Sequence, residues 1–152
     1  MKLAEALMLR ADCQKKIDQL RQRLSRSARV QEGEQPPENP QSLLAELESN
    51  FSELTRLVQQ INKTNASTSL NDGTLSDALV QRDTLKLKCG ALNGLIQQAA
   101  IVGNRYSQSE VKLVSTVDVA ALQRQVDSVS REHRLLDAQI QQLNWQVELL
   151  DE

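Results

Sequence analysis

Cys13, Cys89 and His133 are the three side chains of this 152-residue chain whose types are best suited to chemistry. Two thiolates and an imidazole, with a carboxylate or a water as the fourth ligand, would make a tetrahedral zinc site. All three residues fall at apolar positions of predicted helices. None of them has a second ligand at the short spacing of a zinc motif, and the inward Glu-x-x-His pairs of a di-iron bundle are absent. We therefore expect two core cysteines, one histidine at the edge of a seam and no cofactor; a metal-binding bundle is the alternative, with these residues as its candidates.

The sequence lacks the motifs of common enzymes. It contains no phosphate-binding loop, no nucleophile elbow and no recognisable catalytic triad. Aromatic residues make up 2% of the chain, so bases of a nucleic acid would find no stacking platform, and the net charge is −2. We therefore predict a protein that is not an enzyme and does not bind nucleic acid.

The composition indicates an all-α fold. Hydrophobic residues make up 39% and charged residues 25% of the chain, as in ordinary folded domains. With three aromatic rings, the core must consist of Leu, Ile, Val and Ala, as is typical of helical bundles. Five glycines and three prolines favour a few long elements. The length predicts a single domain over residues 1–152.

Hydropathy argues against membrane insertion and secretion. No segment approaches the roughly 18 consecutive apolar residues of a membrane-spanning helix. The apolar stretch near the N-terminus is interrupted by Glu5, Arg10 and Asp12, which leaves no hydrophobic region of a signal peptide. We therefore expect a cytoplasmic protein without an integral membrane span.

Four segments, about 2–29, 41–65, 75–102 and 117–150, carry apolar residues at alternating spacings of three and four. This spacing places them in one row, or seam, along each helix and predicts coiled-coil-like packing. The first seam is interrupted by Arg10 and otherwise holds Leu3, Ala6, Cys13, Ile17, Leu20 and Leu24. The second holds Leu44, Leu47, Phe51, Leu54, Val58, Ile61 and the polar Asn65. The third holds Leu75, Ala78, Arg82, Leu85, Cys89, Leu92, Ile96 and Ala99. The fourth and clearest holds Val119, Leu122, Val126, Val129, His133, Leu136, Ile140, Leu143, Val147 and Leu150.

Two connectors are marked by residues that break helices. Residues 31–41 gather one glycine and three prolines, and Asn39 followed by Pro40 suits the cap and first position of the next helix. Residues 66–73 are rich in Ser, Thr and Asn and end in Asn-Asp-Gly, which predicts a turn.

The third connector differs, because residues 106–117 contain β-branched residues in rough alternation. They predict a short extended, β-like insert between the third and fourth helices, with Ser115 or Thr116 as the cap of the fourth. In the third helix, Gly90 and Gly94 each reduce stability by about 1 kcal/mol relative to alanine. We expect a closely packed neighbour to compensate.

The charges favour particular helix pairs. Residues 1–30 carry a net charge of +5 and residues 31–62 one of −5, so the first two helices should attract each other as an antiparallel hairpin. Residues 63–105 and 106–152, at +2 and −4, repeat the pattern more weakly. Both a four-helix antiparallel bundle and two coiled-coil hairpins in an elongated rod fit these observations.

Polar residues within the seams suggest a way of setting the alignment of the helices. A buried Arg10 or Asn65 would need a matching partner and would penalise slipped pairings, so we predict that both set the register. Asn62 and Asn65 together could instead bind a polar ligand near the helix end. Helix termination is a simpler explanation for these two residues.

The insert between the third and fourth helices is the best candidate for an interaction surface. It gathers Arg105, Tyr106, Ser107, Ser109 and Lys112, and an extended segment can pair edge to edge with another chain. The alternative is a connector that packs over the end of the bundle.

Several stretches resemble a family of small bacterial proteins of unknown function, some of whose members are labelled septicolysin. They are MKLAEALMLRADCQKKIDQLRQRL, VQEGEQPPENP, INKTNAST, RYSQSEVKLVSTVDVAALQ and QIQQLNWQVELL. The resemblance spans most of the chain and supplies no catalytic residues. The label implies a cytolysin, so a membrane-active protein is one functional alternative.

The interpretation that the residues favour is a non-enzymatic helical module that binds other proteins or acts as a scaffold. Its partner would be a second copy of the chain or another helical protein, recognised through heptad seams. A septicolysin-like membrane-active protein and a metal-binding bundle are the alternatives.

Overall fold

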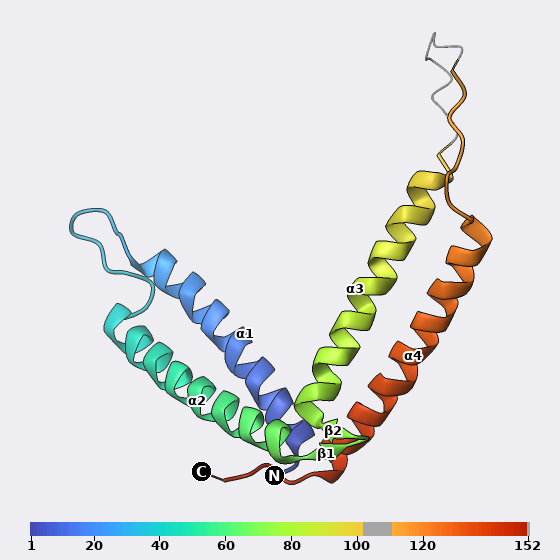
Figure 1. The fold of residues 1–152 in the computed structure, drawn as a ribbon. Helices are drawn as coiled ribbons and strands as arrows, with labels where there is room; N and C mark the ends of the chain where they lie inside the picture. The colour runs from blue at the N-terminus through green and yellow to red at the C-terminus, as the bar shows by residue number, and fades with distance from the viewer. Residues whose placement is uncertain (102–110, 152) are drawn as a thin grey trace. The chain divides into compact units, whose positions relative to one another are not determined.

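The computed structural model describes residues 1–101 and 111–151, and the chain forms four long helices, as predicted (Figure 1). The helices are α1 (Leu3–Ser27), α2 (Pro40–Ser67), α3 (Leu75–Ala99) and α4 (Val119–Gln146). Internal contacts divide the chain into two compact units. The first unit comprises Met1–Thr74 and Gln142–Glu152, and the second comprises Leu75–Gln141. The all-α class is confirmed.

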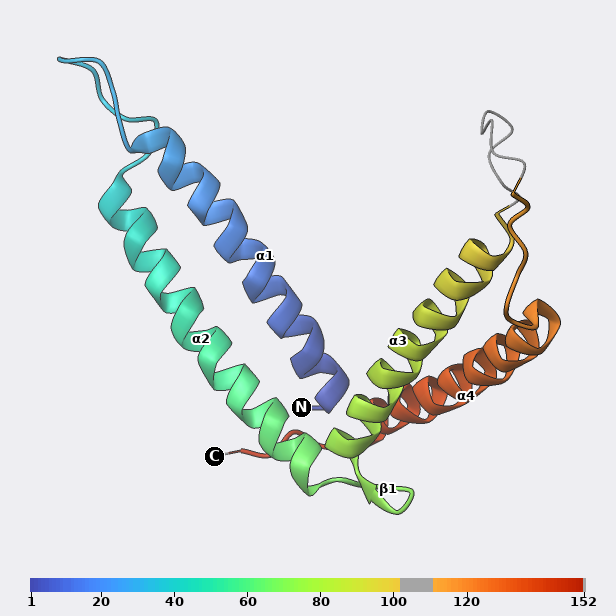
Figure 2. The ribbon, with the colours of Figure 1, turned by 45° about the horizontal axis from the view of Figure 1, so that its top comes forward.

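The first unit is an antiparallel hairpin of α1 and α2, which lie side by side in Figures 1 and 2. Its core includes the fully buried Leu3, Leu20, Leu57 and Ile61. The predicted start of α2 is confirmed, because the side chain of Asn39 accepts a hydrogen bond of 2.9 Å from the Gln41 N–H and Pro40 occupies the first turn. The asparagine satisfies an N–H group that the helix itself leaves unpaired.

The seam of α1 follows the predicted spacing. Its apolar members are buried or half-buried, and the buried Ser27 extends the row by one position beyond Leu24. Arg10 is half-buried at its seam position, and its Nε atom is buried without a hydrogen-bond partner among the described residues. A half-buried arginine can occupy such a position when the rest of its long side chain reaches solvent.

The predicted seam of α2 is wrong at Leu44 and Phe51, which are exposed, while Val58 and Asn65 are half-buried beside a more buried neighbour. Leu47, Leu54 and Ile61 are shared, but the more buried edge contains Leu43, Asn50, Leu57 and Thr64 where the sequence predicted Leu44, Phe51, Val58 and Asn65. The side chains of Leu44 and Phe51 are 47% and 43% exposed.

A wide apolar stripe explains this error. Leu43 and Leu44 are neighbours, as are Leu57 and Val58, so apolar spacing alone suits either edge of the helix. Thr64 favours the observed edge, because it is fully buried with its hydroxyl donating to the Gln60 carbonyl at 2.8 Å. A buried polar group that keeps its hydrogen bonds is compatible with a core position.

Residues after α4 return to the start of the chain instead of continuing the helix. The Leu3 N–H donates to the Val147 carbonyl at 3.0 Å, and the Leu149 N–H donates to the Met1 carbonyl at 2.8 Å. The Leu150 N–H donates to Thr64 Oγ1 at 3.0 Å. We call this contact of residues 1–3 with 147–150 the terminal clasp.

The terminal clasp corrects the predicted end of the fourth helix. Helix α4 ends at Gln146, and the extended backbone after it buries Leu149 and exposes Leu150, the reverse of the seam prediction. Pairing with residues 1–3 supplies backbone partners that the last turn of an isolated helix would lack.

A small antiparallel sheet joins the two helical hairpins in sequence. Strands β1 (Ser69–Leu70) and β2 (Gly73–Thr74) pair across a tight turn in which Asn71 adopts a positive φ of 53°. Asparagine tolerates this conformation better than most residues, which supports the predicted turn. The β-like insert expected between the third and fourth helices has no strand in its described part, 111–117.

The second unit pairs α3 with α4. Both seams follow the prediction through Leu143, with Val126, Val129, Leu136 and Ile140 buried. Asp118 caps α4 through a 3.1 Å bond from the Ala121 N–H, so the predicted Ser115 or Thr116 cap is wrong. Asp118 directly precedes Val119, the first residue of α4, which is the position from which an aspartate side chain caps a helix.

The expected close neighbour of the α3 glycines is absent from the described part of the chain. A Cβ atom built on Gly90 or Gly94 meets no other atom within 4 Å. Both glycines lie on the exposed side of α3, so intrachain packing does not explain why the helix contains them.

Candidate interaction surfaces

The outward side of α2 carries the apolar residues that the seam leaves uncovered. Leu44, Glu48, Phe51 and Thr55 are all exposed and are spaced by four, three and four residues, which places them in a second row beside the seam. We call this row the α2 outer edge. An apolar row at helical spacing is the feature by which one helix recognises another.

Charges on the first hairpin are only partly neutralised within the chain. Arg23 forms an ion pair with Glu38, donating through both Nε and Nη2. This bond lowers the pKa of Glu38 and raises that of Arg23. Among the described residues, Lys15 and Lys16 of α1 and Glu46 and Glu48 of α2 have no ion pair.

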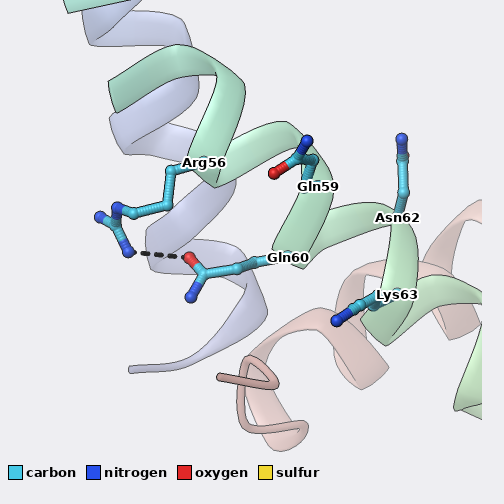
Figure 3. A pocket seen from close by; sticks show the side chains of 5 residues that line it. All are labelled: Arg56, Gln59, Gln60, Asn62 and Lys63. Carbon is cyan, nitrogen blue, oxygen red and sulfur yellow. Dashed lines mark hydrogen bonds between the residues drawn. The ribbon is translucent and has the colours of Figure 1, made fainter. Parts of the chain in front are cut away.

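A polar hollow of 480 Å³ lies against α2 (Figure 3). Its lining includes Arg56, Gln59, Gln60, Asn62 and Lys63. The Arg56 guanidinium donates to both carboxylate oxygens of Glu53, at 2.9 and 2.6 Å, and to Gln60 Oε1 at 2.9 Å. Because the guanidinium already has these partners, the simplest role of the arginine is to hold the nearly buried Gln60 in place.

The two predicted register-setting residues have different surroundings. Asn65 is half-buried, and the adjacent Thr64 takes the fully buried position. Arg10 keeps its seam position. The role of both residues in setting the register stays a prediction. Of the two asparagines predicted as an alternative polar ligand site, Asn62 is among the residues that line the hollow and Asn65 is not.

The three candidate metal ligands occupy different helices. Cys13 is buried on α1, Cys89 is half-buried on α3 and His133 is half-buried on α4. The Cys89 Sγ atom lies 3.3 Å from Ser130 Oγ and accepts a 3.6 Å contact from Asn93 Nδ2. Across residues 1–101 and 111–151, no three His, Cys, Asp or Glu side chains are grouped to hold a metal ion.

A second uncovered apolar surface lies between the end of α3 and the start of α4. A hollow of 390 Å³ is lined by Leu95, Gln98, Ala99, Ile101 and residues 113–117. Leu95, Ile101, Leu113 and Val114 are exposed large apolar residues at this hollow, and we call them the connector patch.

The connector patch borders the interaction surface that the sequence predicted. Lys112 of that surface is exposed, whereas Arg105, Tyr106, Ser107 and Ser109 lie outside the described residues. The predicted surface residues are mostly polar and do not include the apolar residues next to Lys112. Their signal was the run of Val111, Leu113 and Val114 outside any helical seam.

No helix within the described ranges is long and apolar enough to cross a membrane.

Comparison with known proteins gives two matches. The profile described as "Family of unknown function (DUF6847)" matches residues 10–149. The chain is also similar to a solved structure, a functionally unknown conserved protein from Corynebacterium diphtheriae, with 43% sequence identity and a TM-score of 0.93 over 99% of each chain. No curated protein matches the sequence. Neither description mentions a cytolysin.

Proposed function

The chain belongs to the family of unknown function DUF6847, and we propose that it is a non-enzymatic, self-associating helical interaction module. The observation that carries the proposal is the α2 outer edge, where Leu44 and Phe51 remain exposed although the sequence pattern marks both as seam residues. A helix with two apolar rows has one for its own hairpin and one for a partner.

The energetics favour an apolar partner for this edge. Complete burial of a leucine or phenylalanine side chain is worth about 1.5–3 kcal/mol relative to full exposure. In a twofold dimer the same patch is used on both chains, so each residue contributes twice. Leu44 and Phe51 are each roughly half exposed, which leaves a substantial part of this energy for association.

Charge complementarity supports a second copy as the partner. The α2 outer edge includes Glu48 and lies on the acidic helix, while α1 of another copy offers the exposed Lys15 and Lys16. These groups have no ion pair within the described residues of their own chain. Association of two copies can therefore place opposite charges around an apolar centre, which favours correct encounter and orientation.

The test is the mass of the protein in solution, measured by light scattering and sedimentation over a range of concentrations. We expect the wild-type protein to form a defined oligomer and Phe51→Glu to weaken its association at least tenfold. The matched control is Ser49→Glu, which adds the same charge to an exposed position of α2 about 160° around the helix from Phe51. A wild-type protein that stays monomeric at every concentration contradicts the proposal.

A further inference from the structure

We propose that the polar hollow against α2 binds a small molecule through a carboxylate group of that molecule (Figure 3). The inference does not depend on self-association, because the residues named for the hollow are distinct from those of the α2 outer edge. It is carried by the position of Gln60, by the charge of Lys63 and by the size of the hollow.

Gln60 offers the hollow a hydrogen-bond donor of fixed orientation. The residue is 6% exposed, and its Oε1 atom accepts a 2.9 Å bond from the Arg56 guanidinium. Because a guanidinium only donates, the amide presents its oxygen to Arg56 and leaves its nitrogen for another partner.

The Nε2 atom of Gln60 has no such partner in the described parts of the chain. It is also absent from the polar atoms that are fully enclosed without a hydrogen bond, so it is reachable from the hollow that Gln60 lines. A donor on a nearly buried side chain is favourable only when a water or a ligand accepts its hydrogen bond.

Arg56 is a positioning residue in this arrangement. Its guanidinium donates to both carboxylate oxygens of Glu53, at 2.9 and 2.6 Å, in addition to Gln60. The carboxylate balances the charge of Arg56 and fixes its planar group. Arg56 therefore orients the Gln60 amide and adds little net charge to the hollow.

Lys63 supplies the positive charge. It is exposed and makes no ion pair with the described residues. Lys63 follows Gln60 by three residues, and Figure 3 shows the side chains of Arg56, Gln60 and Lys63 extending to the same side of α2. An ammonium group beside an amide donor attracts an anion and gives it a charge-assisted hydrogen bond.

These groups fit a carboxylate on a small polar molecule. Among the named lining residues, one positive charge is uncompensated, and the two oxygens of a carboxylate can accept from Gln60 and from Lys63. The exposed amides of Gln59 and Asn62 both donate and accept, which suits hydroxyl or amino groups on the rest of the molecule. The volume of 480 Å³ lies within the roughly 300–1,000 Å³ of small-molecule sites.

The first experiment is a titration of the full chain with succinate, followed by NMR of the amide signals of residues 59–63. The matched ligand is succinamide, which keeps the carbon chain but has no charge, and sodium chloride holds the ionic strength constant. We expect succinate to shift the Gln60 side-chain amide signal to saturation and succinamide to shift it much less. Equal shifts for the two ligands, or tighter binding of inorganic phosphate than of succinate, overturn the proposal.

The second experiment compares variants in the same titration. Gln60→Glu keeps the shape of the side chain and an acceptor for Arg56 but replaces the donor with a negative charge. Lys63→Gln removes the ammonium group at an exposed position. Each should raise the dissociation constant for succinate about tenfold or more, because a hydrogen bond to a charged group is lost.

The matched controls are Gln19→Glu and Lys16→Gln, which make the same changes at exposed positions of α1 and should leave binding unaltered. Circular dichroism checks that each variant is folded. Unchanged affinity in Lys63→Gln, or an equal loss in Lys16→Gln, contradicts a site at the hollow.

Light scattering separates this site from the proposed self-association. Gln60→Glu and Lys63→Gln should keep the wild-type mass, and Phe51→Glu should keep the affinity for succinate. If the two variants at the hollow reduce the mass, the hollow contacts another copy of the chain and the small-molecule site is wrong. If only Phe51→Glu reduces it and succinate still binds the wild-type protein, both proposals stand.

Discussion

The two helical hairpins of this protein have similar heptad patterns but bury them to different extents. In the first unit, α1 and α2 contain several fully buried side chains, and the terminal clasp and the Arg23–Glu38 ion pair add polar contacts at opposite ends. In α3 of the second unit, only Leu75 and Ala78 are buried, and the rest of its seam is half-buried. A heptad pattern therefore predicts which face of a helix is turned inward, but not how completely that face is covered.

Partly exposed ion pairs are present in both units, so these contacts do not distinguish them. In the second unit, Arg82 donates to Asp137 at 3.1 Å and Cys89 contacts Ser130, both at partly exposed positions. Ion pairs of this kind contribute roughly 0–1 kcal/mol. Because α1 and α2 bury more apolar side chains than α3 does, we expect the first hairpin to carry the larger share of the stability of the chain.

Core truncations in the two hairpins give the largest expected difference. Leu57→Ala removes a fully buried side chain of α2 and should reduce the free energy of unfolding by about 2–5 kcal/mol. Leu85→Ala removes a half-buried seam residue of α3 and should cost less than half as much, because its surroundings are already partly hydrated. Urea unfolding followed by circular dichroism measures both values. Equal losses would contradict the difference between the hairpins.

Removal of the Thr64 hydroxyl tests how much the hydrogen bond from Leu150 contributes to the stability of the first unit. Thr64→Val keeps the shape of the side chain but leaves the Leu150 N–H without its acceptor, so we expect a loss of about 1–3 kcal/mol. Amide hydrogen exchange at Leu150 and Leu149 should accelerate together. The control is Thr55→Val, where an exposed hydroxyl bonds only the Phe51 carbonyl within its own helix. A loss no larger than that of the control would mean that the clasp does not depend on Thr64.

The sequence predicted the four helices and three of the four seams because apolar residues at three-four spacing need no long-range information. It missed the buried edge of α2, since two adjacent apolar pairs fit either edge and the choice depends on the hydrogen bonds of Thr64. It also missed the terminal clasp, in which Leu149 replaces Leu150 in the core. That contact joins residues at opposite ends of the chain, so no local pattern reveals it.

As with the fold, the sequence predicted the candidate surfaces only in part. The sequence indicated the region before α4 but selected its polar residues, whereas the described structure points to Leu113 and Val114. It assigned Leu44 and Phe51 to the core, and their exposure became apparent only once the rotation of α2 was known. Exposure is a property of the packed hairpin, and a heptad pattern reports only the spacing of apolar residues.

Lowering the pH should weaken the terminal clasp and so reduce the difference in stability between the two hairpins. This is the smallest of the expected effects. The pKa of Glu148 lies below its ordinary value of 4.5, because its carboxylate accepts hydrogen bonds from the Lys2 side chain and from the Met1 ammonium group. The folded protein therefore protonates Glu148 at a lower pH than the unfolded chain does. The stabilisation is complete above the unfolded pKa and is lost as the pH falls through the folded pKa.

The direction of this pH dependence predicts a specific pattern of amide hydrogen exchange. Between pH 6 and pH 3, the protection of the Leu149 amide should fall in the wild-type protein, after correction for the intrinsic exchange rate, while that of amides in the middle of α4 should change less. Glu148→Gln should remove this pH dependence, because the amide side chain does not titrate, and should show the weaker clasp at neutral pH. The control is Glu34→Gln in the exposed connector, which should leave the pH dependence intact. If protection rises on acidification, or if Glu148→Gln follows the wild-type curve, the ion pair with Lys2 does not hold the clasp and the greater stability of the first hairpin must come from its apolar core alone.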